Sequence, residues 1–323
     1  MRNFQKNNIN MKLFPAIALI FCLLFSACSQ NPKGDTYTDT PTTGKVEMAV
    51  DETFQPIIEA ELPVFHAMYK YATILPRYLP EAQVLNLLLA DSVRLAVLSR
   101  KLNAKELNYF HRKKFIPQQF PVAIDGIAVL VNPANPDTLF SISQLRKIML
   151  GEITEWKQLN PDSKSGKVKV VFDNPNSSIV RFIVDSITKT GKLGKQLSAT
   201  TFNLDVVDFV SKNPDAIGLI GVSWLSDSRD PESLSFQKRV KVAGVSADEL
   251  ATAGNSFQPY QADLATGKYP LTRFVYMILT EPRAGLGTGF TSFVASDKGQ
   301  RIMLKTGILP YTMPERVVNV KEE

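Results

Sequence analysis

Val168-Lys169-Val170-Val171-Phe172 is followed by the polar turn Asp173-Asn174-Pro175-Asn176-Ser177-Ser178 and by an apolar pattern that ends at Gly191. The first five residues are mostly β-branched and apolar, which is typical of a buried strand. The later apolar residues recur at helical spacing: Val180, Ile183, Val184 and Ile187. We predict a strand, a turn and a helix, with small polar side chains where a helix leaves its first N–H groups unpaired. Either these side chains cap the helix, or an anion binds there.

The first 27 residues have the features of a secretory leader. An apolar run from Leu13 to Phe25 follows the basic residues Arg2, Lys6 and Lys12 and is too short to span a membrane comfortably. Phe25-Ser26-Ala27-Cys28 resembles a bacterial lipobox, with phenylalanine in place of the usual leucine. We predict a signal peptide over residues 1–27 and a lipidated Cys28 as the first mature residue. The alternative is a plain signal peptide with an incidental cysteine.

Charge, cysteine and histidine content exclude several classes of function. The leader holds three positive charges and no negative ones, so its removal lowers the formal net charge from +6 to +3. No stretch interleaves aromatics among clustered Lys and Arg residues, which argues against a nucleic-acid partner. Cys22 leaves with the leader, so no disulfide is expected. His66 and His111 lie in unrelated settings, and we expect no metal site, no histidine triad and no cofactor.

The mature chain alternates strands and helices. Residues 28–45 are rich in Thr, Pro, Gly and Asp and predict a flexible tether. A second strand, turn and helix follows, with Thr53 as the N-cap of a helix whose apolar stripe runs from Phe54 to Met68. The long strand from Phe120 to Pro133, broken by Asp-Gly, is suited to crossing between two lobes. This alternation predicts an α/β protein of about two domains.

Four segments, by their order and spacing together, resemble one known family. They are Asp125–Pro133, Ser143–Trp156, Ala216–Gly221, and a closing segment made of Tyr269–Arg273, Gly299-Gln300 and Gly307–Pro310. The resemblance spans Val46 to Pro310 and is to the phosphate-binding protein of the phosphate ABC transporter, a type II periplasmic binding protein. It implies an α/β fold of two lobes, each with a mixed sheet flanked by helices, and a ligand cleft between them. We expect lobe 1 to comprise residues 46–122 and 222–323, and lobe 2 residues 123–221.

The resemblance also suggests ligand positions. Thr53 and Phe54 match the first phosphate loop of the family, and Ser177 matches the central serine of its Gly-Ser-Gly-Thr loop. The remaining positions depart from the family. Glu81-Ala82 replaces a serine, Arg100 an aspartate, Asp173 an arginine and Ile179 a threonine. Aspartate and arginine have therefore exchanged places, which leaves an ion pair possible across the cleft.

Two hypotheses follow from these departures. In the first, cationic and polar side chains bind phosphate or another small oxyanion. The expected ligand-binding residues are Thr53, Phe54, Ser99, Arg100, Asp173, Asn176, Ser177, Ser178 and Arg181. In the second, Glu81 and Asp173 make the cleft hostile to a dianion, and the protein has an altered ligand or a scaffold role. For Arg181 the alternative is an ordinary solvated residue.

An enzyme is not expected. Gly285-Leu286-Gly287-Thr288-Gly289 lies between a strand and a helix, but it lacks the glycine spacing and the lysine of a nucleotide loop. No constellation of catalytic residues is apparent. We predict a monomeric solute-binding protein of an ABC importer, lipid-anchored to a bacterial membrane at the periplasm or cell surface, which delivers its ligand to a permease by lobe closure.

Overall fold

The computed structural model describes residues 39–226 and 231–312. Cys28 and the predicted leader lie outside these ranges. In the described ranges, no helix combines the length and the apolar character that a membrane span requires.

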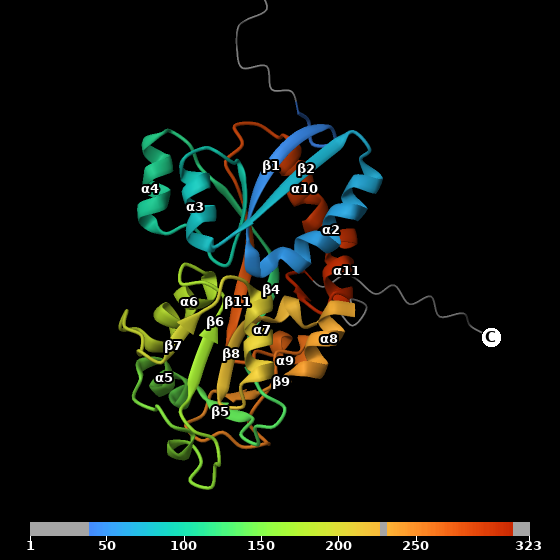
Figure 1. The fold of residues 1–323 in the computed structure, drawn as a ribbon. Helices are drawn as coiled ribbons and strands as arrows, with labels where there is room; N and C mark the ends of the chain where they lie inside the picture. The colour runs from blue at the N-terminus through green and yellow to red at the C-terminus, as the bar shows by residue number, and fades with distance from the viewer. Residues whose placement is uncertain (1–38, 227–230, 313–323) are drawn as a thin grey trace, which may run out of the picture. The chain divides into compact units, whose positions relative to one another are not determined.

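A mixed ten-stranded sheet organises the chain (Figure 1). Its order is β2-β1-β3-β11-β4-β8-β6-β7, and β9 and β12 also pair with β4. The strands are β1 (Gly44–Asp51), β2 (Ala72–Leu79), β3 (Leu95–Leu98), β4 (Gln118–Val131), β6 (Lys169–Phe172), β7 (Leu197–Ala199), β8 (Ala216–Gly221), β9 (Lys241–Val242), β11 (Thr272–Leu279) and β12 (Leu309–Pro310). A separate pair consists of β5 (Leu139–Ser141) and β10 (Gly244–Ser246). Parallel pairs at both ends of the sheet flank antiparallel pairs in the middle.

The long strand β4 is shared by two sets of strands. Its first part pairs with β11 as far as Gly126, and its second part pairs with β8 from Ile127 onward. The prediction of one long strand that crosses between two lobes is therefore confirmed. We call the part built around β1 the first lobe and the part built around β8 the second lobe.

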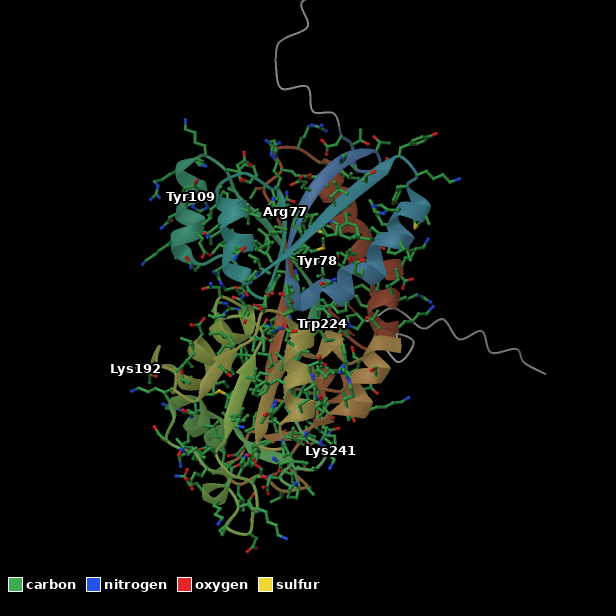
Figure 2. All side chains as sticks on the ribbon, in the orientation of Figure 1. Arg77, Tyr78, Tyr109, Lys192, Trp224 and Lys241 are labelled. Atoms are coloured by element: carbon green, nitrogen blue, oxygen red, sulfur yellow. The ribbon has the colours of Figure 1, made fainter. Side chains whose placement is uncertain are left out.

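Helices cover both faces of the sheet in each lobe. They are α2 (Gln55–Met68), α3 (Glu81–Leu89), α4 (Ala104–Arg112), α5 (Ile142–Leu150), α6 (Ser178–Phe182), α7 (Asn203–Lys212), α8 (Pro231–Arg239), α9 (Gln261–Ala265), α10 (Leu286–Ala295) and α11 (Asp297–Lys305). Short 3-10 turns are η2 (Glu52–Phe54), η3 (Trp156–Gln158) and η5 (Val222–Trp224), and a π-helix, η4 (Ile183–Thr188), continues α6. Figure 2 shows Tyr78 and Tyr109 in the first lobe and Lys192 and Lys241 in the second.

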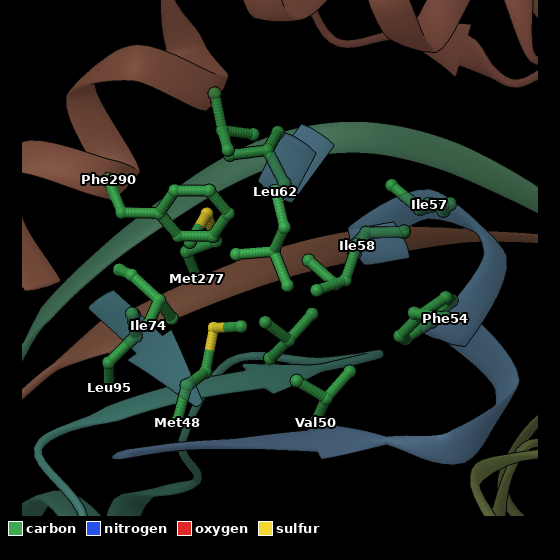
Figure 3. Packing of buried hydrophobic residues seen from close by; sticks show 14 of the residues in the cluster. Met48, Val50, Phe54, Ile57, Ile58, Leu62, Ile74, Leu95, Met277 and Phe290 are labelled. Carbon is green, nitrogen blue, oxygen red and sulfur yellow. The ribbon is translucent and has the colours of Figure 1, made fainter. Parts of the chain in front are cut away.

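Strand residues of the first lobe alternate between two hydrophobic clusters. Met48 and Val50 point toward α2, α10 and α11, as Figure 3 shows for part of this cluster. Ala49 points the other way, toward α3 and α4. Successive side chains of a strand face opposite sides of the sheet, so a strand covered on both faces is apolar throughout. The second lobe repeats this arrangement, with Val170 toward α5 and α6 and Val171 toward α7.

The hydrophobic clusters divide the chain differently from the predicted boundary at residue 222. Apolar residues from Trp224 to Leu271 pack in the clusters of the second lobe, not of the first. The reason is that β9 pairs with the far end of β4, where Val242 lies opposite Leu130. Because of this pairing, the chain stays in the second lobe after β8 and returns to the first lobe through β11.

Two local boundaries also differ from expectation. The predicted tether extended to Lys45, but Asp39 already accepts hydrogen bonds from the backbone N–H of Leu286 at 2.6 Å and from Arg283. The helix predicted to reach Gly191 exists, but it ends at Thr188, where Lys189 has a φ of 56°. Contacts distant in sequence set the end of the tether. A left-handed residue that the sequence pattern did not predict sets the end of the helix.

Phe65 provides a test of the packing in the first lobe. It is fully buried, and its ring centroid lies 5.1 Å from that of Phe290 and 5.4 Å from that of Phe293. We expect Phe65→Ala to lower the free energy of unfolding by about 3–5 kcal/mol, because a cavity replaces the ring. Urea denaturation measures this change. Tyr71→Ala is the control: Tyr71 is 83% exposed, and an equal loss there would contradict the packing described.

Candidate functional site

Polar side chains from three distant segments meet between the lobes. Thr53 belongs to η2, Ser178 begins α6 and Arg273 lies on β11. The two hydroxyl oxygens are 3.4 Å apart, and Arg273 Nη1 donates a hydrogen bond to Ser178 Oγ at 2.7 Å. At most 4% of each residue is exposed. We define the inner cluster as these three residues together with the buried carboxylates Asp51, Asp125 and Asp173.

Arg273 forms a buried ion pair with Asp125, which lies opposite it on β4. Its Nε and Nη2 donate to the same carboxylate oxygen, Asp125 Oδ2, at 3.0 and 2.9 Å. The guanidinium also lies over the ring of Phe54, 5.0 Å from its centroid. Burial raises the pKa of Asp125, and the charge of Arg273 opposes that rise. Two of the three guanidinium nitrogens therefore hold Asp125, and the third is directed at Ser178.

Asp51 is completely buried at the end of β1. Its Oδ1 accepts the backbone N–H of Thr53 at 3.1 Å, whereas its Oδ2 has no hydrogen-bond partner within the described residues. Burial and, next, the negative charge of Glu81 raise the pKa of Asp51 to about 7. Near neutral pH this carboxyl group is therefore divided between its protonated and ionised forms.

Asp173 closes the strand that was predicted from the sequence. Asp173 is 1% exposed, and burial raises its pKa although Ser177 and the N–H of Asn174 donate to its carboxylate. Its Oδ1 has no partner in the part of the chain that the structure describes. The inner cluster thus holds three carboxylates and one guanidinium.

The two serines of the central turn, Ser177 and Ser178, have different hydrogen-bond partners. Ser177 Oγ accepts the N–H of Val180 at 3.3 Å and so caps α6, which is one of the two alternatives predicted for this turn. Ser178 Oγ instead accepts a hydrogen bond from Arg273 Nη1 and lies 3.4 Å from Thr53 Oγ1. Asn176 is exposed and reaches across to the first lobe through its backbone, where its carbonyl oxygen accepts the N–H of Ala82 at 3.3 Å.

A second group of charges, which we call the outer network, lies beside the inner cluster. Glu81, only 3% exposed, accepts hydrogen bonds from Ser99 at 2.5 Å and from Arg181 Nε at 2.8 Å. Arg181 also donates to Ser99 Oγ at 2.6 Å. Because Arg181 is on α6 and Glu81 on α3, this network joins the two lobes.

Arg100 is held by the outer network. It forms a two-pronged contact with Glu106, at 2.8 Å for each bond, and its Nε lies 3.3 Å from Glu81. The exchange of aspartate and arginine left an ion pair between Arg100 and Asp173 possible. In the structure Arg100 pairs with Glu106 and Glu81 instead. Glu106 is the N3 residue of the capping box of α4, and this local geometry places its carboxylate in front of Arg100.

Of the residues expected to bind ligand, the structure brings Thr53, Asp173 and Ser178 into the inner cluster, with Phe54 beneath Arg273 and Ser177 capping the helix. Ser99, Arg100 and Arg181 lie in the outer network. The sequence reasoning missed Asp51, Asp125 and Arg273 as site residues. The available signal was a charged residue within each of two apolar strands, at Asp125 and Arg273.

Gly221 allows the close approach at the inner cluster. A Cβ atom at this position would lie 2.3 Å from Thr53 Cγ2 and 3.2 Å from Arg273 Nη2. Both contacts are shorter than ordinary van der Waals separations. The end of β8 therefore needs glycine for Thr53 and Arg273 to lie where they do.

Arg273→Met tests the buried ion pair. We expect this substitution to lower the free energy of unfolding by about 3–5 kcal/mol, because it leaves the charge of Asp125 buried without a partner. Adding Asp125→Asn should restore most of that loss. Urea denaturation of both variants measures it, and a double variant as unstable as Arg273→Met alone would contradict this account.

Comparisons with known proteins agree with this architecture. A family model described as PBP superfamily domain matches residues 35–298. The chain is 26% identical over 294 residues to the "Phosphate-binding protein PstS" of Staphylococcus saprophyticus, a match that covers 90% of this chain and 86% of that protein. It is 24% identical over 288 residues to the protein of the same name from Staphylococcus aureus (strain USA300), covering 88% and 83%.

Solved structures show the same fold. One from Clostridium perfringens, a protein with bound phosphate, has a TM-score of 0.70 at 19% identity and covers 83% of this chain and 100% of that chain. An ABC-type phosphate transport receptor from Vibrio cholerae has a TM-score of 0.63 at 20% identity, with the same coverage. The α/β architecture is the two-lobed type II fold expected from the sequence. The chain belongs to the PBP superfamily.

Proposed function

We propose that this protein is the solute-binding protein of an ABC importer and that its inner cluster binds phosphate or a related oxyanion. One observation carries the proposal: the hydroxyls of Thr53 and Ser178 and the guanidinium of Arg273 converge at one buried place. Charge-assisted hydrogen bonds of this kind are those by which proteins hold desolvated oxyanions. The names of the relatives above support the same ligand class.

Binding would replace contacts that now join the lobes. Arg273 Nη1 and Thr53 Oγ1 both contact Ser178 Oγ, so an anion entering between them would receive hydrogen bonds from all three. Ser178 begins a helical segment that runs through α6 and η4, whose dipole favours negative charge at this end. Closure of the lobes around the anion would then present the loaded protein to a permease.

The surrounding carboxylates favour a second candidate function. Asp51, Asp125 and Asp173 outnumber the single guanidinium of the inner cluster, and Arg181 and Glu81 already bind one another across the lobes. These features suit a binding-protein-like lipoprotein with an altered ligand or a scaffold role. The two candidates differ in a single property, which is whether the inner cluster binds an oxyanion.

Titration of the purified protein with phosphate separates the candidates. We expect saturable binding in calorimetry, and we expect Ser178→Ala to weaken it about tenfold or more, because a hydrogen bond to a charged ligand contributes about 1.5–3 kcal/mol. The matched control is Ser186→Ala, an exposed serine on the same helical segment, which should leave the affinity unchanged. No heat and no thermal stabilisation at millimolar phosphate would reject the oxyanion site in favour of the second candidate.

We also propose that Cys28 carries a lipid that anchors the protein to a bacterial membrane. The support is the lipobox-like sequence before this residue. We expect Cys28→Ser to move the protein from the membrane fraction to the soluble fraction and to abolish incorporation of a labelled fatty acid. Unchanged membrane association together with absent labelling of the unsubstituted protein would contradict the anchor.

A further inference from the structure

We propose that Asp51 is a ligand-binding residue that takes up a proton when an oxyanion enters the inner cluster. The O–H group formed in this way donates a hydrogen bond to the oxyanion. This inference rests on the oxyanion site proposed above. The proton leaves a hydronium ion or a buffer acid in the solvent, whose bond to hydrogen breaks, and forms one O–H bond on the carboxylate. No covalent bond of the oxyanion changes.

The geometry of Asp51 singles out one of its two oxygens. Oδ1 is engaged by the N–H of Thr53 at 3.1 Å, which orients the carboxyl group beside the Thr53 hydroxyl. Oδ2 is buried and has no hydrogen-bond partner within the described residues. An unpaired buried oxygen of this kind is costly as an anion, but as an O–H it becomes an additional donor.

The charges facing Asp51 make its negative charge unfavourable. Glu81 approaches from α3 and Asp173 from the end of β6, and both repel the Asp51 carboxylate. Arg273 from β11 and the Ser178 hydroxyl from α6 stabilise it. Arg273, however, already directs Nε and Nη2 to Asp125 on β4.

The neighbouring residue adds no positive charge. Glu52 follows Asp51 in the chain, accepts the N–H of Asn203 at 3.2 Å and is repelled by Asp173. An anion entering this site would thus add negative charge to a cluster whose one guanidinium is already paired. In a buried, weakly screened site such repulsion is large, and neutralising one carboxylate relieves it.

The other carboxylates are less suited to hold the proton. Asp125 is paired with Arg273, which favours its ionised form. Asp173 receives donors from Ser177 and Asn174, which also favour ionisation. All three carboxylates keep one oxygen without a hydrogen-bond partner within the described residues. Asp51 differs in being fixed beside the Thr53 hydroxyl through the N–H of Thr53, and its pKa of about 7 makes protonation inexpensive near neutral pH.

The test compares proton uptake in the unsubstituted protein and in Asp51→Asn. Phosphate is titrated calorimetrically at pH 8 in buffers of different ionisation enthalpy, which gives the number of protons taken up per phosphate bound. Asparagine keeps an oxygen for the Thr53 N–H, and the titration of phosphate itself is common to both proteins. We expect the unsubstituted protein to take up close to one proton more than Asp51→Asn.

The affinities give a second readout. Above pH 7 the dissociation constant of the unsubstituted protein should rise about tenfold more per pH unit than that of Asp51→Asn, because one more proton must be bound. Asp185→Asn, which removes an exposed carboxylate on the helical segment of Ser178, should behave like the unsubstituted protein. Equal proton uptake in all three proteins, with phosphate bound, would overturn the role of Asp51 and leave the oxyanion site standing.

A spectroscopic measurement keeps the inference testable if Asp51→Asn fails to fold. Infrared difference spectra of the unsubstituted protein, recorded on adding phosphate at pH 8, should gain a carboxylic-acid C=O band. Phosphate binding without such a band would refute proton uptake by a carboxylate. Absence of phosphate binding at both pH 5.5 and pH 8 would instead refute the oxyanion site, and this inference with it.

Discussion

The ion pair between Arg273 and Asp125 is the interaction around which the junction of the lobes is built. The two residues are cross-strand neighbours on β11 and β4, the long strands in the middle of the sheet. Burying two charges is costly, and the cost is offset only by close geometry and further hydrogen bonds. Here two N–H groups hold one carboxylate oxygen, and the ring of Phe54 covers the guanidinium. The remaining N–H group then positions Ser178, and through it Thr53.

The fold and the ligand chemistry of this protein depend on different residues. The fold depends on strands that are apolar on both faces, such as Met48, Ala49 and Val50, and these need no ligand residue. The inner cluster, in contrast, holds more negative charge than positive charge. A PBP superfamily member can therefore keep its two-lobed sheet while the residues between its lobes change the conditions under which an anion is bound.

Predictions from the sequence succeeded where neighbours in the chain decide the structure. The strand, turn and helix predicted around Asp173 are present in the structure. The apolar residues of this segment repeat at the period of a strand and then at that of a helix. The site was predicted less completely. Ligand binding by Arg100 and Arg181 stays a prediction, and in the structure their partners are Glu106 and Glu81. Arg273 was missed because a single arginine in an apolar strand forms no local motif.

The sequence by itself determined the alternation of elements, the long crossing strand β4 and a polar turn with side chains able to cap the helix after it. These features follow from periodicity and capping, which act over a few residues. Only the tertiary structure decided that Ser178 meets Thr53 across 125 residues and that Arg273 meets Asp125 across 148. The physical reason is that a buried charge is stable only beside its partner, and strand register, set by packing over the whole sheet, decides which residue that partner is.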